Sequence, residues 1–166
     1  KAASGVELHL PDGVRVVRQP DSLLFTKLPE GRGPRQQIAD QIEIFREIEG
    51  PGSYEIPELD RRLEIWQSDD DPAEPHTMRI DCDSIAFPLV LRSIAPGDRF
   101  TPLGGPGSKK VARFLGDRKI PTHLRNLHPV LESDGTIVCV LGLEIDERCR
   151  ITHTSAQQLH IRWTQL

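Results

Sequence analysis

The side chains best suited to binding chemistry lie between Arg92 and Arg125. This segment has eight basic side chains against two acidic ones, Asp98 and Asp117, so its formal charge is +6. The whole chain carries −4, which leaves −10 for the residues outside the segment. A basic segment in an acidic protein predicts a contact surface for phosphate groups. The eight candidate contacts are Arg92, Arg99, Lys109, Lys110, Arg113, Arg118, Lys119 and Arg125.

A loop rich in glycine and proline crosses this segment. The run Leu103-Gly104-Gly105-Pro106-Gly107 has no side chain at its glycines, which allows another molecule to approach the backbone closely. Asp98 follows Pro96-Gly97 and can close its own turn through its carboxylate. We therefore expect four residues to organise the loop: Gly97, Asp98, Gly104 and Ser108.

The loop leads into a predicted helix over residues 109–119, for which Ser108 is a favourable N-cap. Lys109 and Lys110 in the first turn would oppose the helix dipole, so their placement favours an anion nearby. A second short helix is expected from Ile120 onward, with Arg125 one turn in. A solvated basic face is the alternative interpretation, because runs of charge are often solvent-exposed.

The sequence predicts neither a catalytic centre nor a metal site. It has no G-x-x-x-x-G-K-[ST] motif, so the glycines do not form a nucleoside-triphosphate loop of that type. The six histidines and three cysteines show no zinc-ligand spacing, and no nucleophile has a recognisable partner base. The adjacent Asp69, Asp70 and Asp71 are typical of a solvated turn. His123 and His128 flank the basic helix, where packing and RNA contact are both open interpretations.

Strands are predicted for most of the remaining chain. Residues 6–28 contain three short alternating runs separated by turn sequences, which indicates an antiparallel meander. Residues 38–48 fit a helix or a strand, and the neighbouring strands favour a strand. Asp134-Gly135 predicts a hairpin between VLES and TIVCVLG. The predicted fold class is α+β and strand-rich with one or two short helices, and further strands are expected at SYEIPEL, RRLEIWQ, TMRIDCDS, ITHTS and LHIRWTQ.

The charge distribution predicts two parts. Residues 1–91 carry −8 and residues 92–166 carry +4. With the apolar run at 85–94 as the junction, we expect an acidic scaffold over residues 1–88 and a basic domain over residues 89–166. The chain starts at Lys1 and has a single methionine, so we expect a piece of a longer protein. Three widely spaced cysteines predict reduced thiols in the cytoplasm, and no apolar run reaches the roughly 18–20 residues of a membrane span.

Several short motifs follow one another from residue 89 onward. LVLRSIAPGDRFTPLGGPGSKK contains R-x-x-x-x-G-D-R-F-x-P-L-G and a K-K pair, and K-I-P-x-x-x-R, P-V-L, G-x-I-V and I-D-E-R come after it. As a set they resemble the C-terminal domain of bacterial tRNA(Ile)-lysidine synthetases. The start, VELHLPDGVRVVRQPDSLLF, is similar to the segment that precedes this domain in longer members. Cys139 departs from the family, in which an aromatic residue usually follows I-V.

The resemblance implies a β-rich fold similar to a domain of phenylalanyl-tRNA synthetase β chains. It implies a parent enzyme that uses ATP to ligate lysine to the wobble cytidine in the CAU anticodon of tRNA(Ile). ATP and L-lysine would bind an N-terminal catalytic domain that this chain lacks, so the chain would hold no cofactor and be inactive alone. Its partners would be that domain and tRNA(Ile), with the eight basic residues on the acceptor-stem region.

Two other interpretations stay open. In the first, the chain is a structural module for interdomain packing or dimerisation, and its basic segment meets acidic protein in the catalytic domain or in a second copy. In the second, the start of the helix at Ser108 is a small-molecule phosphate site that binds phosphate or a nucleotide without RNA.

Overall fold

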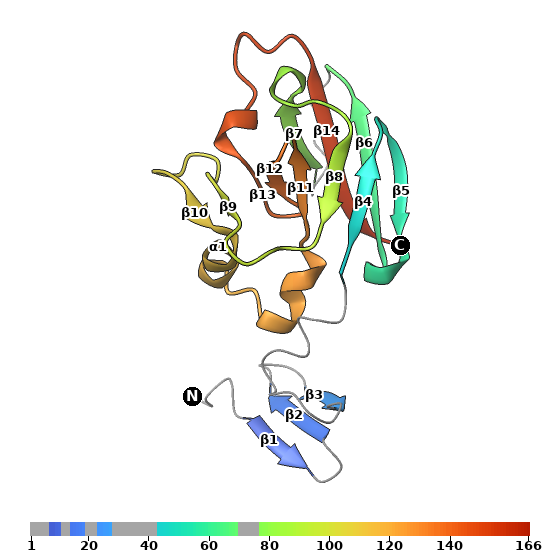
Figure 1. Ribbon diagram of the computed structural model, residues 1–166, viewed down its shortest axis with the longest axis vertical. Helices are drawn as coiled ribbons and strands as arrows, with labels where there is room; N and C mark the ends of the chain where they lie inside the picture. Colours follow the sequence, from blue (N-terminus) through green and yellow to red (C-terminus); the bar gives the residue numbers. More distant parts are fainter. Residues whose placement is uncertain (1–6, 11–13, 19–22, 28–42, 70–76) are drawn as a thin grey trace. The chain divides into compact units, whose positions relative to one another are not determined.

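The computed structural model describes residues 7–10, 14–18, 23–27, 43–69 and 77–166. The chain divides into two compact units, Lys1–Gln41 and Ile42–Leu166. In the first unit, β1 (Glu7–Leu10), β2 (Val14–Arg18) and β3 (Leu23–Lys27) form an antiparallel sheet in that order (Figure 1). The meander predicted from the turn sequences is therefore confirmed.

The described part of the second unit contains two larger antiparallel sheets, a two-stranded antiparallel ladder and one short α-helix (Figure 1). One sheet has the order β5-β6-β14-β7, and the other has the order β13-β12-β11-β8-β4. The strands of the first sheet are β5 (Gly52–Ile56), β6 (Arg61–Gln67), β7 (Thr77–Asp81) and β14 (Gln158–Gln165). Those of the second are β4 (Phe45–Ile48), β8 (Leu89–Arg92), β11 (Val130–Ser133), β12 (Thr136–Val140) and β13 (Glu144–Ile145).

The two sheets enclose the main apolar core. Leu63, Ile65 and Ile161 come from the four-stranded sheet, while Leu91 and Leu131 come from the five-stranded sheet, and all five are buried. Burial of an aliphatic side chain of this size contributes about 1.5–3 kcal/mol. The strand-rich α+β fold predicted from the sequence is confirmed.

A second apolar cluster covers the other face of the five-stranded sheet. It joins Val130, Ile137 and Val140 of the sheet to Phe100, Val111, Phe114 and Leu115. These last residues come from β9 (Arg99–Phe100) and α1 (Val111–Asp117), with β10 (Lys109–Lys110) paired to β9. Because β12 is covered on both faces, it reads as an unbroken apolar run and not as an alternating one.

The division expected at residue 88 falls inside the second unit. β4 pairs with β8, and β6 pairs along its whole length with β14. These long-range pairings put acidic and basic stretches of the chain into the same two sheets. The structure therefore places the division before Ile42.

Four local predictions around the helices and strands need correction. α1 begins at Val111, with Lys110 at the N-cap position and no side-chain cap, so Ser108 is not its N-cap. Lys109 and Lys110 precede the helix and form a short strand that pairs antiparallel with β9. The second helix is a 3₁₀ helix, η4 (Thr122–Leu127). Residues 151–155 form turns and no strand.

Other local predictions are confirmed. Asp134 and Gly135 have φ values of 47° and 73° in the tight connection between β11 and β12, as an Asp-Gly hairpin requires. Residues 45–48 are a strand, whereas residues 38–42 lie outside the described ranges. None of the helices in the described part of the chain is long and apolar enough to cross a membrane.

Candidate nucleic-acid interface

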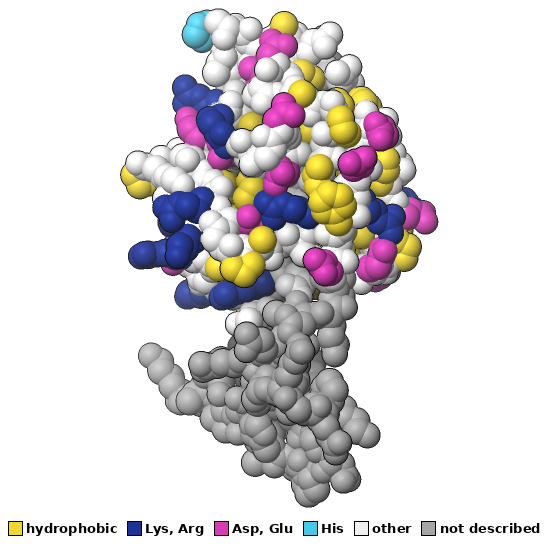
Figure 2. Space-filling model, in the orientation of Figure 1, with side chains coloured by type: hydrophobic (Ala, Val, Ile, Leu, Met, Phe, Trp, Pro, Cys, Tyr) yellow, Lys and Arg dark blue, Asp and Glu magenta, His cyan; other side chains and the backbone are white. Residues whose placement is uncertain are grey.

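Five of the eight candidate basic residues line one groove. The groove lies between the Gly-rich loop (residues 102–107) and α1, and its volume is about 790 Å³. Figure 2 shows dark blue side chains gathered at this side of the unit. Asp117 is the one acidic residue in the lining. The basic groove is defined by Arg99, Lys109, Lys110, Arg113 and Arg118, with Phe114 and the Gly-rich loop as its apolar and backbone walls.

Two of these cations face each other across a strand ladder. Arg99 of β9 pairs directly with Lys110 of β10, and both side chains are exposed. Like charges directly opposite each other in a ladder are destabilising. The Arg99 guanidinium hydrogen-bonds Ser108, with Nε donating to Oγ at 3.1 Å and a terminal NH₂ donating to the carbonyl at 3.0 Å. Ser108 thus orients a cation of the groove, and the unfavourable pair is the arrangement that a bound anion would relieve.

The remaining groove cations differ in how far they are neutralised. Lys109 is 2.9 Å from Asp117 and lowers the pKa of that carboxyl by hydrogen bonding to it. Arg118 lies 2.7 Å from Glu144 and also stacks over the Phe114 ring, 4.9 Å from its centroid. Among the described residues, Arg113, Lys110 and Arg99 form no ion pair at hydrogen-bonding distance with a carboxylate, although Arg113 lies close enough to Asp117 to contribute to lowering its pKa. They are the three groove cations most available to phosphate.

Lys119 lies just beyond the groove in an unusual backbone conformation. Its φ is 58°, in the left-handed region. Its N–H donates to the Gly116 carbonyl at 2.9 Å, and the next N–H, of Ile120, donates to Leu115 at 3.0 Å. This pair of bonds is the Schellman C-cap, in which glycine is the usual residue at the left-handed position. A lysine here costs stability and presents an exposed charge at the end of α1.

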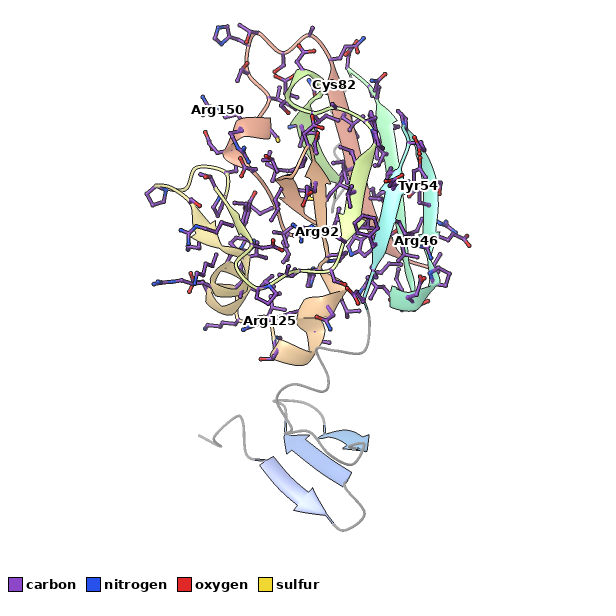
Figure 3. The ribbon with its side chains drawn as sticks, viewed as in Figure 1. Arg46, Tyr54, Cys82, Arg92, Arg125 and Arg150 are labelled. Atoms are coloured by element: carbon purple, nitrogen blue, oxygen red, sulfur yellow. The ribbon has the colours of Figure 1, made fainter. Side chains whose placement is uncertain are left out.

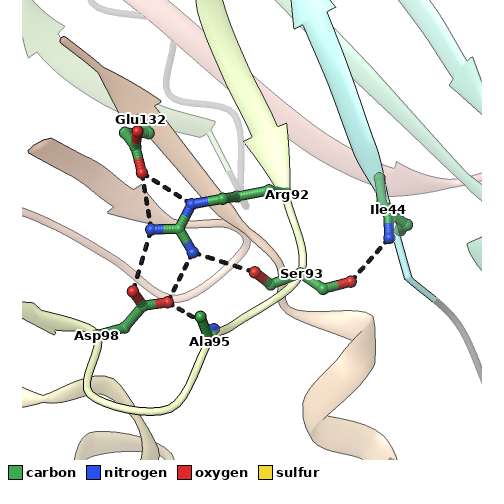
Figure 4. Close-up of polar contacts among 6 residues, drawn as sticks. All are labelled: Ile44, Arg92, Ser93, Ala95, Asp98 and Glu132. Carbon is green, nitrogen blue, oxygen red and sulfur yellow. Dashed lines mark hydrogen bonds and ion pairs between the residues drawn. The ribbon is translucent and has the colours of Figure 1, made fainter. Parts of the chain in front are cut away.

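Arg92 is placed inside the unit and apart from the groove (Figures 3 and 4). Its guanidinium makes two hydrogen bonds to Asp98, at 2.8 and 3.0 Å, and also binds Glu132 at 2.7 and 2.8 Å. The side chains of Arg92 and Asp98 are 20% and 12% exposed. Hydrogen bonding to Asp98, and to a smaller extent to Glu132, raises the pKa of Arg92 above its ordinary value. Because two carboxylates neutralise it, Arg92 differs from the other seven candidates.

The Asp98 carboxylate also closes the turn before β9. It accepts a hydrogen bond of 2.7 Å from the Ala95 N–H (Figure 4). The Asp98 carbonyl accepts one of 2.9 Å from the Val111 N–H. Gly97 stands in this turn with φ of 96°. The network from Arg92 through Asp98 therefore connects the sheet to the first residue of α1.

Arg125 lies on η4, next to the end of α1 (Figure 3). Its Nε donates to the Ile120 carbonyl at 3.2 Å, and this side chain is half-buried. His128, at the end of η4, contacts the Leu141 carbonyl through Nδ1 at 3.1 Å, and burial lowers its pKa. The side chain of His123 lies outside the described residues.

The Gly-rich loop is held against residues that the charge pattern did not single out. Gly104 has φ of 68°, and its N–H donates to the Glu147 carboxylate at 2.8 Å. A Cβ on Gly105 would lie 2.8 Å from the Pro102 carbonyl oxygen, so this turn requires glycine. Asp146 accepts a bond of 2.8 Å from the Thr101 N–H. Asp146 and Glu147 belong to the I-D-E-R motif, and only that motif marked them in the sequence as residues of interest.

Nothing in the described ranges forms a group of three potential metal ligands. Asp70 and Asp71 are outside those ranges. The three cysteines are free thiols, and burial raises the pKa of each. A thiol with a raised pKa is a poor nucleophile at neutral pH. The groove offers cations, backbone and one aromatic wall, which suit a polyanion.

The chain resembles one family of tRNA-modifying enzymes. Residues 89–163 match the family described as the TilS substrate C-terminal domain. The tRNA(Ile)-lysidine synthase of Caldanaerobacter subterraneus subsp. tengcongensis is 28% identical over 159 residues, which are 96% of this chain and 33% of that protein. The synthase of Symbiobacterium thermophilum is 33% identical over 147 residues, covering 86% of this chain and 30% of that protein. The chain thus spans about a third of these relatives.

One solved structure shares the fold over most of the described chain. It is a crystal structure of a TilS C-terminal domain, with a TM-score of 0.65 and 22% identity. The match covers 75% of this chain and 98% of that one. Most of the chain therefore shares the fold of this domain.

Proposed function

Because residues 89–163 belong to the TilS substrate C-terminal domain family, we propose that this chain is the tRNA-binding C-terminal part of a tRNA(Ile)-lysidine synthase. In this proposal the basic groove binds the sugar–phosphate backbone of tRNA(Ile), in the acceptor-stem region. The observation that carries it is the convergence of five cations from β9, β10 and α1 on one groove.

The groove suits a helical RNA backbone better than a free base. Its polar lining is almost entirely cationic, and such side chains contact phosphate oxygens without reading sequence. Double-stranded RNA is recognised mainly by shape and by contacts to phosphates and 2′-hydroxyls. The Gly-rich loop adds a wall of backbone with few side chains, which a ribose can approach closely. We assign Lys119 and Arg125, at the end of α1, to the same RNA surface.

The chemistry of the parent enzyme belongs to a domain outside this chain. That domain would bind ATP and L-lysine and modify the wobble cytidine, while this chain holds the tRNA body. The chain alone would be inactive, with tRNA(Ile) and the catalytic domain as its partners in the cytoplasm. Arg92 takes a different role in this proposal from the one expected at first, because its charge is used to fix the turn at Asp98.

Binding of an unmodified tRNA(Ile) transcript at several salt concentrations tests the proposal. Lys110→Ala/Arg113→Ala removes two groove cations that form no ion pair at hydrogen-bonding distance with a described carboxylate. We expect the binding constant to fall by roughly tenfold or more. The magnitude of the slope of log K against log[salt] should fall by roughly 1–2, because fewer counterions are released on binding when phosphate contacts are lost.

Arg46→Ala/Arg62→Ala is the matched control. It removes the same formal charge from β4 and β6, where each arginine already pairs with a glutamate at 2.6 and 3.2 Å. We expect its affinity and salt slope to stay near those of the unmodified chain. An equal loss of affinity in the two double variants would mean that net charge alone governs binding, and it would refute the assignment of the groove as the RNA-binding site.

A structural role in dimerisation or interdomain packing is the second candidate. The observation that favours it is Phe45 on the edge strand β4, which is 67% exposed. Exposed aromatic side chains on an edge strand favour association with another protein surface. Sedimentation with and without tRNA separates the two candidates, since a tight dimer that is indifferent to tRNA supports the structural role.

A further inference from the structure

Two consecutive acidic residues hold the first half of the Gly-rich loop. Asp146 and Glu147 follow β13, and Glu147 opens the 3₁₀ helix η5 (Glu147–Cys149). The buried Asp146 carboxylate accepts a hydrogen bond of 2.8 Å from the Thr101 N–H. The Glu147 carboxylate accepts one of 2.8 Å from the Gly104 N–H. The Glu147 carboxylate therefore binds a backbone donor of the loop, and the Asp146 carboxylate binds the donor of the residue that immediately precedes the loop.

The backbone around these residues adds two more hydrogen bonds. The Glu147 N–H donates to the Thr101 carbonyl at 2.7 Å, and the Leu103 N–H donates to the Ile145 carbonyl at 3.2 Å. Together these two bonds form the isolated antiparallel bridge between Pro102 and Asp146. At the other end of the loop, Ser108 is held by Arg99. The Gly-rich loop is thus fixed at both ends, although its glycines make it intrinsically flexible.

Two arginines balance the negative charge of this pair. Arg148 donates to Asp146 from Nε at 2.8 Å and from its backbone N–H at 3.0 Å. Arg150 lies 2.9 Å from Glu147 (Figure 3 shows its position). Burial would raise the pKa of Asp146, but the hydrogen bonds from Arg148 and Thr101 outweigh it and keep the carboxyl ionised.

We propose that Asp146 and Glu147 are positioning residues for RNA binding, which hold the Gly-rich loop in the shape that forms one wall of the basic groove. The inference rests on the function proposed above. Neither carboxylate would touch the RNA. Their contribution would come from ordering the loop before RNA arrives, so that binding does not have to order it.

The direction in which RNA affinity changes when a carboxylate is removed distinguishes a positioning role from a purely electrostatic one. Two carboxylates beside a phosphate-binding surface repel RNA, so removal of either one should tighten binding if charge alone matters. If the loop needs its anchor, removal should weaken binding in spite of the gain in positive charge. The two explanations therefore predict changes of opposite direction.

Two substitutions of Glu147 separate its charge from its hydrogen bond. Glu147→Gln removes the charge and keeps an oxygen that can accept from Gly104, whereas Glu147→Ala removes both. Both substitutions remove the ion pair of Glu147 with Arg150. We expect the Gln variant to bind a tRNA(Ile) transcript as tightly as the unmodified chain or up to roughly threefold more tightly. The Ala variant should bind roughly fivefold more weakly, with its salt slope unchanged because no phosphate contact is lost.

Hydrogen exchange measured without RNA provides an independent readout of the same chain. The Gly104 amide should be protected in the unmodified chain and in Glu147→Gln, and should exchange rapidly in Glu147→Ala. The hairpin amides of β11 and β12 should keep their protection in all three proteins, which shows that the fold is intact. A Gly104 amide that stays protected in the Ala variant would show that Glu147 does not anchor the loop.

The outcomes also separate this inference from the proposed function. Equal tightening in both Glu147 variants would refute positioning while leaving tRNA binding in place. Absence of tRNA binding by the unmodified chain would refute the proposed function, and positioning for RNA would be refuted with it. In that case the exchange data would still decide whether Glu147 anchors the loop.

Discussion

Lys119→Gly should raise stability and lower RNA affinity in the same molecule. Lys119 occupies the left-handed position of the Schellman cap, with φ of 58°. That conformation costs a residue with a Cβ about 1–2 kcal/mol, and glycine avoids the cost. Glycine also gains about 0.4–1 kcal/mol of freedom in the unfolded chain, which opposes the benefit. The net expectation is a gain of about 0.5–1 kcal/mol in the free energy of unfolding.

The effect on RNA binding has the opposite sign. Lys119 is exposed and has no carboxylate partner among the described residues, so its removal should take away one phosphate contact. We expect the salt slope for a tRNA(Ile) transcript to fall by roughly 0.7–0.9 and the affinity to fall several-fold. Lys119→Arg is the matched control, because it keeps both the charge and the strained conformation and should leave stability and slope unchanged.

Urea unfolding followed by tryptophan fluorescence measures the stability change. Trp66 and Trp163 both lie in the unit Ile42–Leu166, so the signal reports on that unit. With a slope of about 2 kcal/mol per molar urea, the midpoint should rise by about 0.3–0.5 M. A lower midpoint would refute the assignment of a strained C-cap. A higher midpoint with unchanged RNA binding would keep the cap and remove Lys119 from the interface.

Two other predictions concern stability. Arg92→Met should lower the free energy of unfolding by about 2–4 kcal/mol in urea titrations, because it leaves the largely buried carboxylates of Asp98 and Glu132 without a cation; an unchanged midpoint would show that this network is dispensable. The pKa of His128 is lowered by burial, so the unfolded chain binds its proton more tightly than the folded chain. Stability from this group is therefore present above the unfolded pKa of about 6.5 and is lost as the pH falls below it. The loss of stability between pH 7.5 and 5.5 should be smaller in His128→Gln, and an equal loss in both proteins would contradict this prediction.

Local features of the fold followed from the sequence because short segments determine them. The Asp134-Gly135 hairpin depends on two residues that tolerate positive φ, and the structure has them in that conformation. The strands of the first unit were marked by alternating residues between turn sequences. The short family motifs together indicated the fold, because all of them are present and follow one another in the family's order.

Long-range contacts decided which candidate residues share a surface. Arg92 and Arg99 are close in sequence and carry the same charge, yet Arg92 is neutralised by Asp98 together with Glu132 of β11, whereas pairing with β10 brings Arg99 into the groove. The charge pattern of the segment does not encode that difference, because it depends on which carboxylates and strands the folded chain brings to each arginine.

The same reason explains the helix start, the unit boundary and the loop anchors. Pairing with β9 drew Lys109 and Lys110 out of the predicted helix, because a strand partner outweighed a weak local propensity. The pairing of β6 with β14 joined the acidic and basic parts in one sheet. Glu147 meets Gly104 only in the folded chain. The sequence by itself determined most of the strands, the net charge of the segment and the family resemblance, whereas tertiary packing decided which charges stay available to a ligand and which hold the fold together.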